Sequence, residues 1–175
     1  KELGFSMLFI SVVSAIAHLL RAVSSLPMGR FADKYSFSSM LILCFSIQGL
    51  ALALNTFTVP ANGHVFFAIY AALNCISMAG INSALINLVY DYVPGRMRTA
   101  ALAFQSILNG LVGFSTTLIA SRLVAYIQRS GNHFLGFHIY AQQVLSAISC
   151  IACLLTILYL CLVVRRIRRV QTPET

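Results

Sequence analysis

Long apolar stretches alternate with short polar breaks along the whole chain, and this pattern predicts five membrane-spanning segments. Prolines and glycines mark most of the breaks, as at Pro94-Gly95. Runs of 20 or more uncharged residues recur between them, which is enough to cross a hydrocarbon core of roughly 30 Å. The predicted spans cover residues 4–28, 37–57, 65–93, 97–127 and 137–164.

Continuous spans of this length must be helical, because backbone groups in lipid have no water with which to bond. Strands of a membrane barrel would be about ten residues long and would alternate in polarity, and neither property holds here. We therefore expect an all-α polytopic membrane helix bundle. It forms one partial domain over residues 1–175, which ends in a tail at 165–175.

The composition excludes a water-soluble domain. Only 9% of the residues are charged and 59% are hydrophobic, so a single core could not cover the apolar side chains. The net charge of +8 would suit a nucleic-acid partner, but the basic residues sit at the ends of the spans, where topology signals lie. We expect the lipid bilayer as a partner and no nucleic acid.

The basic residues also predict the orientation in a cell (inner) membrane. Eight of the twelve lie on one side of the predicted bundle: Arg30, Lys34, Arg96, Arg98, Arg165, Arg166, Arg168 and Arg169. The positive-inside rule places that side, with its basic tail, in the cytoplasm. Five spans that start outside suggest a six-helix unit without its leading helix.

The thiols and imidazoles indicate no metal site. All five cysteines fall inside apolar segments, where cysteine packs as a small hydrophobe. Cys150-x-x-Cys153 has no second pair with which to bind zinc, and His133 and His138 flank a loop without acidic or thiol partners. We expect neither a metal nor a cofactor.

The segment Gly29-Arg30-Phe31-Ala32-Asp33-Lys34 separates the first two spans and is expected to form a short loop at the membrane surface. Gly29, Asp33 and Lys34 match the spacing of G-x-x-x-D-[RK]-x-G-[RK]-x-[RK], the signature of the major facilitator superfamily. The chain resembles that family of secondary transporters over essentially its whole length. The departures from the signature are Ser36, Phe37 and Ser39.

A weakened signature is typical of the carboxy-terminal copy in that family. The resemblance therefore implies helices eight to twelve of a twelve-helix transporter, so that the chain is a fragment and its partner is the missing amino-terminal half. Helices two to six of the amino-terminal half are the alternative. The implied function is transport of a small-molecule substrate by alternating access, by a protein that is not an enzyme. Uptake and efflux both stay open.

The resemblance also implies a gating role for charges near the signature. The family's loop aspartate is thought to clamp the inward face shut. By analogy, Asp33 would meet a helix start in the other half and Arg96 or Arg98 in this half, and Asp91 would pair with Arg30 or Lys34. Ordinary topology charges are the alternative. The expected gating set is Gly29, Asp33, Lys34, Asp91, Arg96 and Arg98.

Polar residues inside the spans predict the substrate cavity, because such residues are costly in hydrocarbon. In the first span they recur in steps of three and four and share one helical face: Ser11, Ser14, His18, Arg21 and Ser25. The cavity candidates are Ser14, His18, Arg21, Asn74, Gln105 and Asn109. The alternatives are that Arg21 reaches the cytoplasmic surface, that His18 is a hydrogen-bonded packing residue, and that the amides join helices. Gly80 and Gly110-x-x-Gly113 are expected to permit close helix contact.

Other kinds of membrane protein fit less well. A membrane-embedded enzyme would gather acids, paired histidines or a nucleophile with its base inside the bilayer, and none of these clusters is visible. A structural or assembly subunit would need no polar stripe such as the one in the first span. A channel would be expected to show a repeated filter sequence.

Overall fold

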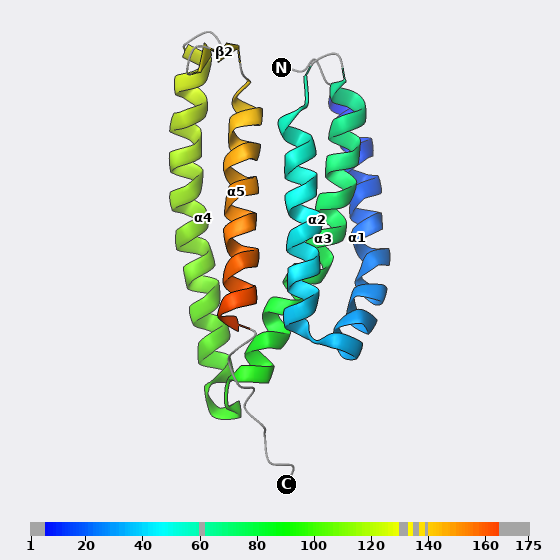
Figure 1. Cartoon of the computed structure of the whole chain (residues 1–175), viewed down its shortest axis with the longest axis vertical. Helices are drawn as coiled ribbons and strands as arrows, with labels where there is room; N and C mark the ends of the chain where they lie inside the picture. The colour runs from blue at the N-terminus through cyan, green and yellow to red at the C-terminus, as the bar shows by residue number, and fades with distance from the viewer. Residues whose placement is uncertain (1–5, 60–61, 130–132, 135–136, 139, 165–175) are drawn as a thin grey trace.

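A computed structural model describes residues 6–59, 62–129, 133–134, 137–138 and 140–164. Within these residues the chain folds into a bundle of long helices that run up and down in turn (Figure 1). The helices are α1 (Met7–Tyr35), α2 (Phe37–Thr56), α3 (Gly63–Tyr92), α4 (Arg98–Arg129) and α5 (Ala141–Leu162). A 3₁₀ turn at Gly95–Met97 precedes α4. All five helices are long and apolar enough to cross a membrane, which confirms the predicted all-α membrane bundle.

The first helix differs from its prediction. It continues through Pro27 to Tyr35, so that the expected loop is the last two turns of α1. Proline deprives one carbonyl of its donor, and membrane helices tolerate this loss where neighbouring groups compensate. The chain breaks instead at Ser36, whose φ of 151° lies in the region that favours glycine. The Ser36 hydroxyl accepts a hydrogen bond from the Ser39 amide at 3.2 Å and caps α2.

The last helix also begins later than predicted. Two short strands, β1 (His133–Phe134) and β2 (Phe137–His138), pair antiparallel between α4 and α5, so that residues 137 and 138 belong to a hairpin. Tyr140 then caps α5, and its amide donates to Gln143 Oε1 at 3.1 Å. The basic residues of the predicted tail, from Arg165 onward, lie outside the described residues.

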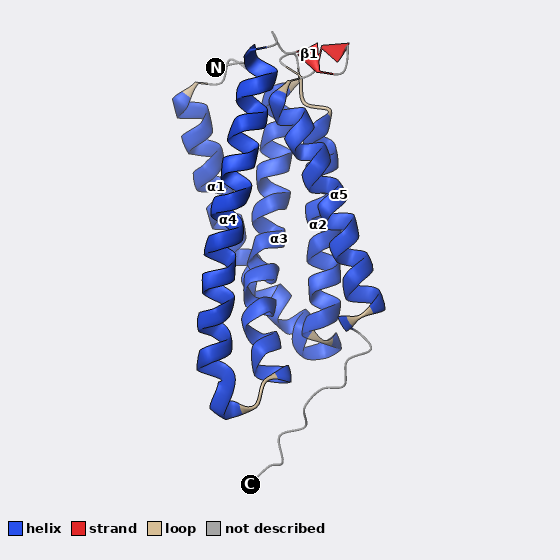
Figure 2. Cartoon of the chain, turned by 90° about the vertical axis from the view of Figure 1, so that its left-hand side faces the viewer, coloured by secondary structure: helices blue, strands red, loops and turns tan. Residues whose placement is uncertain are grey.

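The helices pack unevenly. α3 packs against both α1 and α2, and α2 also packs against α5, whereas α4 has much sparser contacts with α3 and α5. Figure 2 shows α1 and α4 on one side of the bundle and α2 and α5 on the other, with α3 between them. The buried core lies mainly between α2 and α3 and includes Met40, Leu41, Cys44, Ile81 and Ala84.

The glycines differ between the dense α2–α3 contact and the sparsely packed α4. A methyl group added at Gly80 would collide with Cys44 Sγ, so this glycine does permit the close α2–α3 contact that was predicted. The same prediction is wrong for Gly110 and Gly113. A methyl group at either position would meet no atom within 4 Å, because this part of α4 faces open space.

The bundle has two ends, which we name after Asp33 and Asn55. The Asp33 end carries the last turns of α1 and α3, with Asp33 and Asp91, and the start of α4. The Asn55 end lies opposite and carries the end of α2, the hairpin and the start of α5.

Candidate functional site

α1 has three distinct faces. Val13, Ala17 and Leu20 face α3 and line a small cavity with Ala68 and Ala72. A second face is apolar and exposed, as lipid-facing residues are: Leu19 is 67% exposed, and Val23 and Leu26 are each 70% exposed. The third face is polar. It carries the stripe predicted in the sequence, and α1 is helical throughout it: Ser11, Ser14, His18, Arg21 and Ser25.

Two of the smaller polar side chains of this face, His18 and Ser25, bond to their own helix. His18 Nδ1 lies 2.7 Å from the Ser14 carbonyl oxygen. A carbonyl only accepts, so Nδ1 carries the proton in this contact. Ser25 Oγ donates to the Ala22 carbonyl at 2.7 Å. These bonds hold the His18 ring and the Ser25 hydroxyl in place on the exposed face.

Arg21 differs from its neighbours because it bonds to nothing in the described part of the chain. It is only partly exposed and lies at the middle of α1. The nearest charged residue on the Asp33 side is Arg30, about 14 Å away along the helix axis at 1.5 Å per residue. If Arg30 marks the membrane surface, Arg21 lies close to the middle of a hydrocarbon layer of roughly 30 Å.

A hollow of about 350 Å³ lies between α3 and α4. It brings together two predicted cavity residues, Gln105 and Asn109, which are one turn apart on α4, and adds Asn82 from α3. Gln105 Oε1 is buried and accepts no hydrogen bond. A buried amide oxygen without a donor is costly, so this hollow suits a ligand that can donate to it.

The α1 polar face and this hollow lie on the same side of the molecule. α1 and α3 run in the same direction, from the Asn55 end to the Asp33 end. Right-handed helical geometry then places the α1 polar face and the hollow-lining residues of α3 on one side of the α1–α3 contact. α1 and α4 lie toward the same edge of the bundle in Figure 2, and Figure 1 shows that they stand apart, with the other helices between them.

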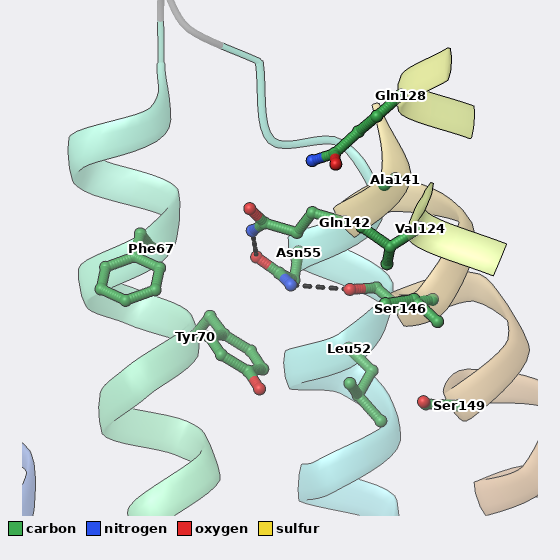
Figure 3. Close-up of a pocket in the computed structure, with 11 residues that line it drawn as sticks. Leu52, Asn55, Phe67, Tyr70, Val124, Gln128, Ala141, Gln142, Ser146 and Ser149 are labelled. Atoms are coloured by element: carbon green, nitrogen blue, oxygen red, sulfur yellow. Dashed lines mark hydrogen bonds between the residues drawn. The ribbon is translucent and has the colours of Figure 1, made fainter. Parts of the chain in front are cut away.

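A second pocket, of about 480 Å³, opens between α2, α3, α4 and α5 at the Asn55 end (Figure 3). Its polar wall is a network around Asn55, which donates to Ser146 Oγ at 2.7 Å and accepts from Gln142 Nε2 at 2.8 Å. Thr58 Oγ1 also donates to Asn55 Oδ1, at 3.3 Å. This network ties α2 to α5, which is a structural role. Asn55 was not among the predicted residues, although an amide inside an apolar span is a visible signal.

Asn74, a predicted cavity residue, lies in neither hollow. Its Oδ1 accepts a hydrogen bond from Gln48 Nε2 at 2.9 Å, and Ser77 Oγ donates to Gln48 Oε1. This chain of polar groups joins α2 to α3 inside the bundle. Asn74 therefore follows the helix-joining alternative in this structure, because an amide in hydrocarbon takes the nearest polar partner.

The predicted gating residues lie at the Asp33 end without the expected ion pairs. Gly29, Asp33 and Lys34 belong to α1, and among the described residues Asp33 and Asp91 form no ion pair with Arg30, Lys34, Arg96 or Arg98. Arg98 instead donates to the carbonyls of Tyr90 and Val93, at 3.0 and 3.1 Å, and lies over the Tyr90 ring. It thus fastens the end of α3 to the start of α4.

No group of three or more His, Cys, Asp or Glu side chains is placed to hold a metal ion within the described segments. The geometry is that of a helical membrane protein with a polar face and an amide-lined hollow on one side.

Comparison with known proteins agrees with this geometry. The family model of the Major Facilitator Superfamily matches residues 1–175, the whole chain. Searches of curated proteins and of solved structures found no match. A match over the full length, together with five helices able to cross a membrane, shows that the chain belongs to the major facilitator superfamily of membrane transporters.

Proposed function

We propose that this chain is the carboxy-terminal part, helices eight to twelve, of a secondary transporter that moves a small solute by alternating access. The observation that carries the proposal is the polar face of α1, which no described helix covers. We assign the substrate cavity to this face and to the α3–α4 hollow. Helices two to six of the amino-terminal half stay the alternative placement.

The cost of polar groups in lipid supports this assignment. A guanidinium near the middle of the bilayer costs several kcal/mol, on the order of 3 kcal/mol by insertion scales, unless it meets water or protein. His18 and Arg21 share one face, so that face is suited to a water-filled cavity or to the rest of the transporter. The opposite side of α1, with Leu19 and Val23, is suited to lipid.

The charges of the Asp33 end support the proposed orientation. Arg30, Lys34, Arg96 and Arg98 gather at this end, which by the positive-inside rule is cytoplasmic. Asp33 is exposed there and makes no bond to the described residues, so its carboxylate is available to a helix start in the other half. This availability is what a gating role for Asp33 requires.

The test is Arg21→Ala in the complete protein. A transported solute is first identified by comparing accumulation of a panel of labelled solutes in cells with and without the protein. Arg21→Ala should then abolish uptake or efflux while membrane expression is unchanged. Leu19→Ala is the matched control, because Leu19 lies two residues away on the lipid-facing side, and it should transport normally. Unchanged transport by Arg21→Ala would overturn the cavity assignment.

A further inference from the structure

We propose that the transported solute carries an oxyanion, such as a carboxylate, and that Arg21 is the cation that binds it. This inference rests on the proposed function, in which the α1 polar face lines the cavity. It adds the charge class of the solute, which membership of the family leaves open.

Arg21 has no counter-charge among the described residues of the chain. The sequence holds four acidic residues: Glu2, Asp33, Asp91 and Glu174. Asp33 lies twelve residues along α1 from Arg21, about 18 Å at the helical rise, and Asp91 lies in the last turn of α3 at the same end of the bundle. Arg21 forms no ion pair or hydrogen bond with the described residues. A cation in this position gains most from an anion brought by a ligand.

The neighbours of Arg21 on the same face do not balance its charge. His18, about one turn toward the Asn55 end, has Nδ1 committed to the Ser14 carbonyl. Ser25, about one turn toward the Asp33 end, donates to Ala22. Neither neighbour is acidic, so neither neutralises the guanidinium. The α3–α4 hollow is lined by amide, hydroxyl and apolar side chains only, so Arg21 supplies the charge in the proposed cavity.

The shape of the Arg21 side chain also suits an oxyanion. A guanidinium offers donors in a planar fork that matches the two oxygens of a carboxylate or the oxygens of a phosphate. It cannot lose its proton inside a protein, so its charge is permanent. Arg21 is therefore suited to bind an anion in preference to a neutral analogue.

The experiment measures the charge that a small reagent meets beside Arg21, and it needs no knowledge of the solute. Ser25→Cys is made in the complete protein, since Ser25 is exposed and lies about 6 Å along the axis from Arg21. The rates of its reaction with anionic sulfonatoethyl methanethiosulfonate and cationic trimethylammonioethyl methanethiosulfonate are measured in membranes. The measurement is repeated with Arg21→Gln and with Arg21→Lys in the same background.

We expect the anionic reagent to be favoured while Arg21 is present. Arg21→Gln should lower the ratio of anionic to cationic rates by tenfold or more, given the Coulomb energy of a unit charge at this range and an effective dielectric constant of about 20. Arg21→Lys should keep most of the ratio because it retains the positive charge. A fall in the ratio with Arg21→Gln but not with Arg21→Lys is then due to the charge and not to packing. Ser14→Cys, on the same face at the other side of Arg21, provides a second thiol should Ser25→Cys fail to fold.

Two controls and two contrary outcomes complete the test. The protein without an added cysteine gives the background of its native thiols, and Leu26→Cys, on the lipid-facing side, should react with neither reagent.

If the Ser25→Cys thiol reacts with both reagents and Arg21→Gln leaves their ratio unchanged, Arg21 is neutralised by an acid elsewhere in the protein. That outcome overturns the anion inference and leaves the cavity standing. If the thiols at 14 and 25 react with neither reagent, the cavity assignment falls as well.

Discussion

The α2–α3 contact and the exposed length of α4 use the same residue types for opposite purposes. Gly80 is packed so tightly against Cys44 that a methyl group would not fit, whereas Gly110 and Gly113 face open space. Small residues in a membrane helix allow close approach only where a second helix is present to approach. A glycine pattern therefore shows where a close helix contact is sterically possible, and the contact forms only where a neighbouring helix is present.

The amides of the two regions differ in the same way. Gln48 and Asn74 bond to each other between α2 and α3, and Ser77 completes the chain. On α4, Gln105 Oε1 is buried without a donor. A satisfied amide stabilises the fold, and an unsatisfied amide is left with binding capacity. We therefore expect substitutions in the α2–α3 contact to reduce stability and substitutions in α4 to reduce transport.

The largest expected effect comes from Gly80→Ala. The new methyl group collides with Cys44 Sγ, and overpacking of this kind costs about 2 kcal/mol of unfolding free energy. Thermal unfolding of the purified protein in detergent would show it as a lower midpoint. Gly113→Ala is the matched control and should not lower the midpoint, because its methyl group meets no neighbour and alanine is the better helix former.

Cys44→Ala tests the cause of that loss. It removes the sulfur with which the methyl group collides, so the double variant Gly80→Ala/Cys44→Ala should recover part of the loss caused by Gly80→Ala. Equal losses for Gly80→Ala and Gly113→Ala would remove the distinction between the two regions.

Gln48→Leu should have a smaller effect. It deletes the hydrogen bonds to Asn74 and Ser77, and a hydrogen bond between membrane helices contributes about 0.6 kcal/mol on average, so we expect a loss of about 1 kcal/mol. Gln105→Leu should keep the unfolding midpoint, because it removes an unpaired oxygen, but should slow transport. A stability loss for Gln105→Leu as large as that for Gln48→Leu would contradict the contrast.

The smallest effect is expected from Ser36→Gly, at the joint between α1 and α2. Ser36→Gly removes the strain of a positive φ at the cost of a weak cap, and should raise the unfolding free energy by about 0.5 kcal/mol. Ser36→Ala keeps the strain and loses the cap, so it should lower that free energy by about 1 kcal/mol. Opposite signs for these two variants, measured by thermal unfolding, would identify the backbone as the cause.

The sequence predicts the helical class and the five spans well, because long apolar runs leave the backbone no alternative in lipid. It misplaces the first break, since Pro27 ends helices in water but is tolerated inside a membrane helix. The family signature does indicate where the chain breaks. Ser36 occupies the position of the second glycine of the signature, and the structure shows a positive φ there. Ser36 thus departs from the family pattern at the position where the backbone adopts a conformation that favours glycine.

Side-chain roles are less predictable than helices. The stripe from Ser11 to Ser25 follows from helical periodicity alone, and the structure leaves it uncovered by described helices. Asn74 and Gln105 look alike in the sequence, as amides within apolar spans. Their difference depends on whether Gln48 or an open hollow lies opposite, which is a property of the packed helices.

A single residue, Ser36, connects α1 to α2, and this has a mechanical consequence. Because the connection is this short, a displacement of the last turn of α1, which carries Asp33, also displaces the start of α2. From there the Gly80 contact passes it to α3, which also packs on α1. α2 also packs on α5, so these four helices are coupled to one another, and α4, with its sparse contacts, is the helix least coupled to them.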